Sequence, residues 1–326
     1  AEDGIRDRDV TGVQTCALPI YQGQAINRFL FPNMMTAEPK GRGSNSLKDR
    51  FYDDNKLVRA IRLCFDHRDG NNLAHPTAVR RALELVTGEN VQNFKPLNAR
   101  SIVEYLCPVL WGNVYDYSAG YGGRLLGIST SKMRYNYVGI DPNTETFEYL
   151  NYLNDLIYDT VGNRGVLIKT VSEKHKPDGL VDLAISSPPY FNLEKYSDEP
   201  TQCMNQFTTL DDWFDGYVAP TMKNILGSLE DDGIFATNIA DYKIGSNKEF
   251  KVVDRWIEQV LLAQKQYPID DPKRFYGFGS IEEQTNDALK RINHCITLIK
   301  LQHPEIAVGY LTDVRDQDKL NYWHHV

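Results

Sequence analysis

The chain has 326 residues, of which 41% are hydrophobic and 25% charged, with a formal net charge of −8 and an isoelectric point near 5.4. This length allows one large α/β domain with insertions or two domains, and the composition is that of an ordinary globular protein. No apolar run reaches membrane-spanning length and no signal peptide is evident, so we expect a cytoplasmic protein without a membrane partner. The acidic balance excludes an overall basic surface, so any contact with nucleic acid needs local basic patches.

The five cysteines are scattered along the chain. They form no C-x-x-C pair and have no histidine partners at zinc spacing: Cys16, Cys64, Cys107, Cys203 and Cys295. This pattern predicts reduced thiols in an intracellular protein and no metal site.

Residues 1–20 differ in character from the rest and resemble the translation of a sequencing adapter. We expect a non-native tail without function, on a chain of metagenomic or phage origin, with a genuine polar tail as the alternative. Residues 21–90 are expected to form a helical, locally basic extension, and residues 91–326 a catalytic domain.

Basic residues alternate with aromatic ones over residues 38–72. The basic ones are Lys40, Arg42, Lys48, Arg50, Lys56, Arg59, Arg62 and Arg68, and the aromatic ones are Phe51, Tyr52 and Phe65. Such a pattern can follow a phosphate backbone. Four aspartates dilute the charge, so a solvated helical face is the favoured interpretation: Asp49, Asp53, Asp54 and Asp66. Helices are predicted at 76–86 and after Phe94-Lys95-Pro96.

The next segment predicts the order strand, glycine turn, helix. A strand at 114–117 enters the turn Ser118-Ala119-Gly120-Tyr121-Gly122-Gly123-Arg124, and a helix starts near Leu125. Glycines let the backbone approach a ligand, and a helix N-terminus offers free N–H groups, as in nucleotide-type cofactor sites. A dinucleotide fingerprint requires Gly or Ala where Leu125 stands, so the pattern favours a methionine-carrying cofactor over a pyrophosphate.

A second predicted strand, 137–140, ends in Asp141. This acid lies about twenty residues beyond the glycine turn, the distance at which a carboxylate meets ribose hydroxyls. An ordinary acidic strand end is the alternative. With a helix at 144–158 and strands at 165–170 and 180–186, the order predicts a parallel sheet with right-handed crossovers.

Two prolines end the apolar strand at 180–186. Proline fixes φ and has no backbone N–H, so the strand ends in a rigid turn. The turn leaves the Ser187 hydroxyl, the Pro188 carbonyl and the Tyr190 ring at the carboxyl end of the strand, where open α/β sheets bind ligands. We interpret Ser187, Pro188, Pro189 and Tyr190 as the catalytic residues of an amino-group methyltransferase. An ordinary strand-to-loop exit is the alternative.

The remaining chain predicts a substrate loop followed by alternating helices and strands. The loop at 191–208 carries Asn192, Lys195, Tyr196 and Gln202. A helix at 210–229, a strand at 234–240 and a helix at 251–264 follow, and 296–301 with 306–311 predict an antiparallel pair. Residues 273–278 are a second basic-aromatic candidate inside a possible substrate-recognition insertion at 241–294.

The glycine turn at 116–123, the acid at 141 and the Ser-Pro-Pro-Tyr turn occur in an order that resembles the exocyclic-amino DNA methyltransferases. That family has a D-x-x-x-G-x-G cofactor loop and an S/D/N-P-P-Y/F catalytic motif, and the resemblance covers roughly residues 94–240. It implies a Rossmann-like, seven-stranded sheet with helices on both faces, its last strand antiparallel, and S-adenosylmethionine as methyl donor. The resemblance assigns cofactor binding to Phe94, Lys95, Asp116, Ser118, Gly120, Gly122 and Asp141.

The resemblance also implies double-stranded DNA as the partner, with the target base flipped out of the duplex. Tyr190 would stack on that base, and Phe191, Asn192 and Tyr196 would complete the substrate site. Serine at position 187 favours cytosine N4, in a restriction-modification or phage DNA-modification system, with adenine N6 as the alternative. An RNA or protein-glutamine amino methyltransferase and an inert DNA-binding module are rival interpretations. No target-recognition domain is recognisable after the catalytic motif.

Overall fold

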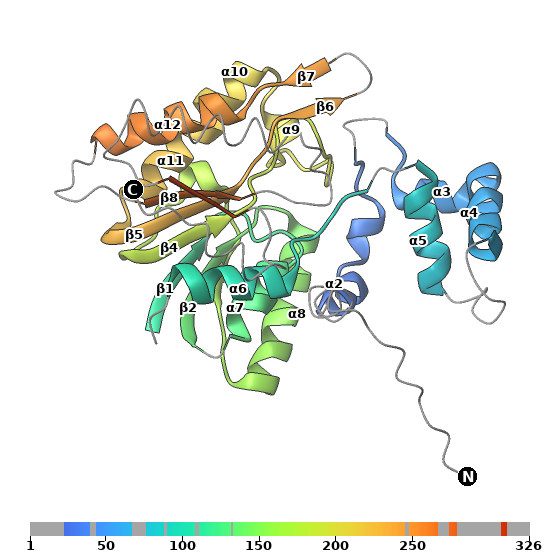
Figure 1. Cartoon of the computed structure of the whole chain (residues 1–326), viewed down its shortest axis with the longest axis horizontal. Helices are drawn as coiled ribbons and strands as arrows, with labels where there is room; N and C mark the ends of the chain where they lie inside the picture. The colour runs from blue at the N-terminus through green and yellow to red at the C-terminus, as the bar shows by residue number, and fades with distance from the viewer. Residues whose placement is uncertain are drawn as a thin grey trace, which may run out of the picture.

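The computed structural model describes residues 23–39, 44–66, 76–87, 90–107, 111–131, 133–244, 248–266, 274–278 and 308–311. Its centre is a seven-stranded sheet in the order β3-β2-β1-β4-β5-β8-β9 (Figure 1). The strands are β1 (Trp111–Asp116), β2 (Arg134–Ile140), β3 (Val166–Ile168), β4 (Val181–Ser186), β5 (Leu229–Asn238), β8 (Arg274–Phe278) and β9 (Val308–Leu311). All neighbouring pairs run parallel, which confirms the predicted parallel sheet.

Helices cover the sheet in two groups. The first contains α6 (Pro96–Leu106), α7 (Gly123–Ser129) and α8 (Thr144–Val161); the second contains α10 (Leu210–Trp213), α11 (Ala219–Leu226) and α12 (Val253–Gln266), with a π-helical turn at Phe214–Val218. Strand side chains alternate between the two: Val114 and Leu183 pack with the first group, and Tyr115 and Ala184 with the second. This alternation follows from the period of two in a strand.

The end of the sheet differs from the expectation. Residues 296–301 lie outside the described part of the chain, and β9 pairs parallel with β8, so the predicted antiparallel last strand is wrong. The basic-aromatic candidate at 273–278 is largely strand β8, between β5 and β9. A proline near 304 indicated a hairpin, whereas parallel neighbours need a connection much longer than a hairpin turn.

The N-terminal region consists of two parts. Helix α2 (Gln24–Leu30) and the 3-10 turn η1 (Pro32–Met35) pack against the sheet domain, with Phe31 fully buried in its core. Helices α3 (Leu47–Tyr52), α4 (Asp54–Asp66) and α5 (Pro76–Thr87) have a small core of their own and stand to one side (Figure 1). The predicted tail, 1–20, lies outside the described residues.

A two-stranded hairpin, β6 (Tyr242–Ile244) with β7 (Lys248–Phe250), follows β5. Short helix α9 (Cys203–Gln206) lies in the loop after β4. In the described ranges, no helix combines the length and apolar character needed to cross a membrane.

The sheet order changes direction between β1 and β4. From β1 the chain moves outward to β2 and β3, and then returns to place β4 on the other side of β1. Val114 and Tyr115 of β1 are in register with Leu183 and Ala184 of β4. The carboxyl edge at such a switch point is where open α/β sheets bind ligands. Both the glycine turn and the Ser-Pro-Pro-Tyr turn start at this edge.

Candidate active site

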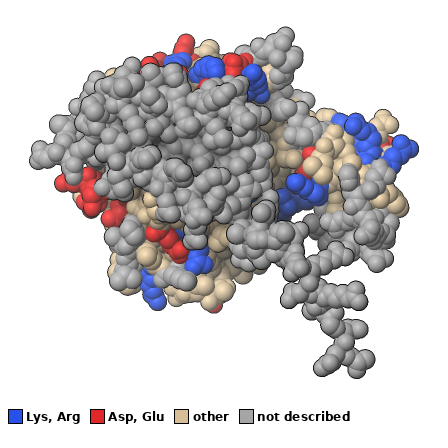
Figure 2. Space-filling model, in the orientation of Figure 1, with Lys and Arg blue, Asp and Glu red and all other residues tan. Residues whose placement is uncertain are grey.

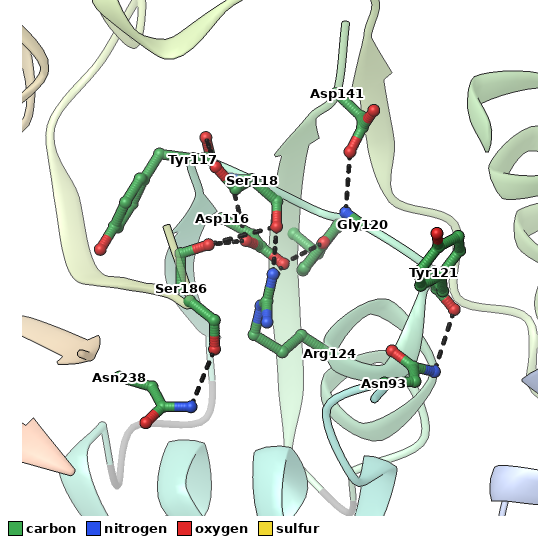
Figure 3. A network of polar contacts seen from close by, with 12 residues as sticks. Asn93, Asp116, Tyr117, Ser118, Gly120, Tyr121, Arg124, Asp141, Ser186 and Asn238 are labelled. Atoms are coloured by element: carbon green, nitrogen blue, oxygen red, sulfur yellow. Dashed lines mark hydrogen bonds and ion pairs between the residues drawn. The ribbon is translucent and has the colours of Figure 1, made fainter. Parts of the chain in front are cut away.

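The glycine turn is held from behind by the carboxylate of Asp116, the fully buried last residue of β1. Its Oδ1 accepts from the Ser118 N–H (3.2 Å) and the Ser186 hydroxyl (2.7 Å), and its Oδ2 accepts from Arg124 Nε and the Tyr137 hydroxyl, both at 2.8 Å (Figure 3). A buried carboxylate is stable only when it is paired and hydrogen-bonded in this way. Asp116 therefore shapes the turn and has no free surface to offer a ligand.

Arg124 completes this support from the first turn of α7. Its guanidinium donates to the Ser118 carbonyl and lies 5.2 Å from the centre of the Phe94 ring. A Cβ on Gly123 would collide with the Phe94 carbonyl oxygen, so the close approach of the two segments requires glycine there. Phe94, assigned to the cofactor from the sequence, thus backs the turn. Lys95 is the N-cap of α6, without a side-chain cap bond.

Gly120 and Gly122 both have positive φ, 55° and 70°, but their surroundings differ. A Cβ on Gly122 would lie 2.6 Å from Leu153 Cδ2, inside the core. Around Gly120 the same atom would meet only the Ser118 carbonyl, at 3.8 Å. Gly120 is therefore the turn glycine that leaves open space for a ligand.

Asp141 lies directly after β2 and faces the turn (Figure 3). Its Oδ2 accepts from the Gly120 N–H (2.9 Å) and its Oδ1 from the Asn143 N–H (3.0 Å). Each oxygen keeps a lone pair for a hydroxyl donor. Burial raises the pKa of Asp141 to about 6, and the two backbone N–H groups only partly offset it.

The Ser-Pro-Pro-Tyr turn is supported by the chain that leaves β5. Ser187 Oγ accepts from Asn238 Nδ2 at 3.2 Å, and the Tyr190 hydroxyl accepts from the Ala240 N–H at 2.9 Å. Tyr242 then donates to Asn192 Oδ1 at 2.9 Å, and its ring meets the Tyr190 ring edge to face at 5.0 Å. Every second residue of this segment, Asn238, Ala240 and Tyr242, thus helps to hold the Ser-Pro-Pro-Tyr turn in place.

All three predicted substrate residues after Tyr190 have structural partners. Phe191 is only 7% exposed and packs 6.0 Å from the Phe250 ring, so it belongs to the core of the domain. Tyr196 donates to Glu194 and meets Tyr121 edge to face. Asn192 is half-buried beside the hairpin. Tyr190 is half-buried, so part of its ring is accessible at the turn beside its contact with Tyr242.

An N-terminal strap, residues 23–39, was missed by sequence reasoning. Asn27 Nδ2 donates to the Tyr121 carbonyl in the glycine turn at 2.7 Å, where Asn93 donates as well (3.1 Å). Farther along, the backbones of Glu38 and Lys195 exchange two 2.9 Å hydrogen bonds, and their side chains form a 3.2 Å ion pair. The strap thus connects the glycine turn to the loop after the catalytic turn.

No sequence signal marked these supports clearly. Asn238 had the clearest sequence signal of these supports, because it is a polar residue near the carboxyl end of the strand predicted at 234–240. Asn27 and Glu38 are separated from their partners by most of the domain, and their partners become visible only in the fold. Across the described residues, no cluster of three or more His, Cys, Asp or Glu side chains is arranged to hold a metal ion.

No protein-family model matches the chain, and no curated protein does. Three solved structures are similar at 13% sequence identity. A protein of Methanococcus maripaludis proposed to be an S-adenosylmethionine-dependent methyltransferase has a TM-score of 0.32, covering 63% of this chain and 75% of its own. An S-adenosylmethionine-dependent methyltransferase of Clostridium acetobutylicum has a TM-score of 0.32, and the match covers 51% of this chain and 62% of that protein. The glycopeptide N-methyltransferase MtfA, complexed with sinefungin, has a TM-score of 0.31, and the match covers 45% of this chain and 50% of MtfA. This chain thus spans less than two thirds of the length of the Clostridium protein and of MtfA. Similarity at this level says nothing of its chemistry, which is argued below from its own residues.

Proposed function

We propose that this chain is an S-adenosylmethionine-dependent methyltransferase that methylates the exocyclic amine of a flipped DNA base, with cytosine N4 favoured. One observation carries the proposal. An open glycine turn with an acid beside it and a Ser-Pro-Pro-Tyr turn end neighbouring central strands, β1 and β4, at the switch point of the sheet. The adjacent positions of the two turns support the proposal of a cofactor site beside an amine-holding site.

The residues at the first turn suit S-adenosylmethionine. Gly120 leaves room for a ligand against the backbone, and the free lone pairs of Asp141 suit the two ribose hydroxyls. When bound, the cofactor supplies a methyl group on a positively charged sulfur. Asp116 and Arg124 keep the turn in the required shape.

The second turn suits a planar amine. The exocyclic nitrogen of a base is a weak nucleophile because its lone pair is delocalised into the ring. Ser187 Oγ, with one acceptor position left beside Asn238, and the Pro188 carbonyl can accept the two amine protons and so favour a pyramidal nitrogen. Transfer of the methyl group breaks its bond to sulfur and leaves the nitrogen positively charged, and the nitrogen regains neutrality by passing one of these protons to water. Tyr190 is fixed at its hydroxyl and can stack on the base.

The choice of DNA and of cytosine rests on the motif. Serine at position 187 supports N4-cytosine over N6-adenine. RNA or protein glutamine remain the alternatives, as does an inert module of the same fold.

The test is mass spectrometry of the products after incubation with S-adenosylmethionine carrying a labelled methyl group. Duplex DNA, structured RNA and a glutamine-rich peptide are offered separately. We expect label in N4-methylcytosine from DNA. Label in N6-methyladenine would change the base, label in RNA or peptide alone would change the substrate class, and no label with tight cofactor binding would contradict the proposal.

A further inference from the structure

The helical unit formed by α3, α4 and α5 exposes large apolar side chains although it has its own core. Phe51, Tyr52 and Phe65 are 46%, 74% and 58% exposed. Grouped apolar exposure of this kind marks an interaction surface on a folded protein.

The cations of this unit fall into two groups. Arg50 is buried and donates to the Asn45 carbonyl and to Asn90, and Arg80 and Arg81 both pair with Glu84. These arginines stabilise the unit. In the described part of the chain, exposed Lys48, Arg59 and Arg62 make no such pair. Figure 2 shows Lys and Arg side chains on the outside of this unit.

Three of the four aspartates that dilute the charge in the sequence lie at helix starts, and the fourth, Asp66, is the last residue of α4. Asp49 caps α3 by accepting from the Ser46 N–H and hydroxyl, at 2.9 and 2.6 Å. Asp53 accepts from the Lys56 backbone and pairs with its ammonium at 3.1 Å. Asp54 is the first residue of α4, where a negative charge favours the helix. Their charges are therefore largely committed to local structure.

Arg59, Arg62 and Phe65 follow one another at intervals of three on α4, so they neighbour each other on one side of the helix. The adjoining helix α3 exposes three further basic or aromatic residues, and we call the six together the docking face: Lys48, Phe51, Tyr52, Arg59, Arg62 and Phe65.

The strap joins the helical unit that carries the docking face to the loop after the catalytic turn. Glu38 pairs with Lys195 beyond the catalytic turn, and α3 begins at Leu47, nine residues later and so at most about 30 Å away. Met35 packs against the core of the helical unit, and Arg28 of α2 pairs with Glu84 of α5 at 4.0 Å. One turn of B-DNA is about 34 Å long, which is more than this limit on the distance between the Glu38–Lys195 contact and the start of α3.

We propose that the docking face binds the backbone of duplex DNA while the target base enters the catalytic turn. The inference rests on the proposed function and names where its substrate is held. Three cations that pair with no acid among the described residues match phosphates, which provide most of the affinity in protein–DNA contacts. The adjoining aromatic rings match sugars and base edges, as apolar side chains do in groove-binding proteins.

The experiment measures binding of a fluorescent 30-base-pair duplex by anisotropy between 50 and 200 mM KCl. The variant is Lys48→Gln/Arg59→Gln/Arg62→Gln. Its charge-matched control is Lys174→Gln/Lys176→Gln/Lys223→Gln, which removes exposed lysines in and beside η2 (Ser172–Lys174) and on α11. Removing one contact to a phosphate reduces the magnitude of the slope of log affinity against log salt by about 0.9. We therefore expect the magnitude of the slope to fall by about 2.7 for the triple variant and to equal the wild-type value for the control.

A second pair of variants separates aromatic from ionic contacts. Phe51→Ala/Tyr52→Ala should weaken duplex binding by about fivefold or more at an unchanged salt slope, because rings release no counterions. Tyr152→Ala/Tyr158→Ala, on the exposed side of α8, should bind as the wild type does.

Cofactor affinity and melting temperature, which should match the wild type, show that each variant is folded. If the triple variant binds duplex with the wild-type slope while the wild type methylates DNA, the docking face is refuted and the proposed function stands. If the wild type methylates RNA or peptide instead, the proposed function fails first. A change confined to self-association, seen by light scattering, would assign the face to a second copy of the chain and overturn the inference.

Discussion

The glycine turn and the Ser-Pro-Pro-Tyr turn end adjacent strands of one sheet, but different forces hold them. The glycine turn is fixed by a buried ion pair, Asp116 with Arg124, and by the close packing of Gly122 against core side chains and of Gly123 against the Phe94 backbone. The Ser-Pro-Pro-Tyr turn is fixed by single hydrogen bonds from residues 238–242 and by aromatic contacts. The difference implies that changes at the first turn threaten the fold, whereas changes at the second affect chemistry and leave the fold intact.

The largest effect should come from breaking the buried ion pair. Asp116→Ala leaves Arg124 charged and unpaired in the core, which typically costs about 3–5 kcal/mol. Urea denaturation measures this loss. The control, Asp155→Ala, removes an exposed partner of Arg164 and should cost at most about 1 kcal/mol. Equal losses in the two variants would show that the Asp116 network does not support the fold.

Asp141 belongs to the glycine turn but keeps lone pairs for a ligand, so its removal should affect binding more than stability. Asp141→Ala should weaken S-adenosylmethionine binding by about 1.5–3 kcal/mol, the value of hydrogen bonds to a charged group. Calorimetry on the folded variant checks this, and unchanged affinity would remove Asp141 from the cofactor site.

The raised pKa of Asp141 adds a pH dependence. Hydroxyl donors need the ionised carboxylate, so cofactor affinity should fall roughly tenfold per pH unit below about 6, and Asp141→Asn should lose this dependence. The sign for stability is opposite. Since the folded pKa lies above the ordinary value of 3.8, folding becomes more favourable as the pH falls from about 6 towards 3.8. A flat affinity profile in the wild type would contradict the assignment.

At the second turn, Tyr190→Ala should weaken binding of the nucleic-acid substrate by roughly 1–3 kcal/mol, the value of one base–aromatic contact. Tyr190→Phe keeps the ring and removes the hydroxyl that accepts from the Ala240 N–H, so it is the matched control. The comparison is made on the KM for DNA. Similar defects in both variants would show that the hydroxyl matters and the ring does not.

The smallest effect should come from Asn238→Ala, which removes one neutral hydrogen bond to Ser187, worth about 0.5–1.5 kcal/mol. We expect a lower single-turnover rate at unchanged cofactor affinity and unfolding free energy. A loss of cofactor affinity would show that the two turns are not held independently.

The sequence is most informative where local chemistry determines structure. Glycines at 120, 122 and 123 and prolines at 188 and 189 fix turns by their own backbone preferences, so both turns can be located from the residues themselves. The supports from Asn27, Asn238 and Tyr242 depend on tertiary contacts between distant segments, which no local pattern encodes. The parallel pairing of β9 depends on a crossover that its apolar pattern does not reveal.

The most direct test of the account is single-turnover methylation of duplex DNA by Ser187→Ala, measured beside a cofactor titration. Losing one preorganised hydrogen-bonding group costs about 10²–10³ in rate in other enzymes. We therefore expect a fall of that size with wild-type affinity for S-adenosylmethionine, while Ser131→Ala, at the end of α7, methylates normally. Methylation by Ser187→Ala at the wild-type rate would contradict the assignment of catalysis to the Ser-Pro-Pro-Tyr turn.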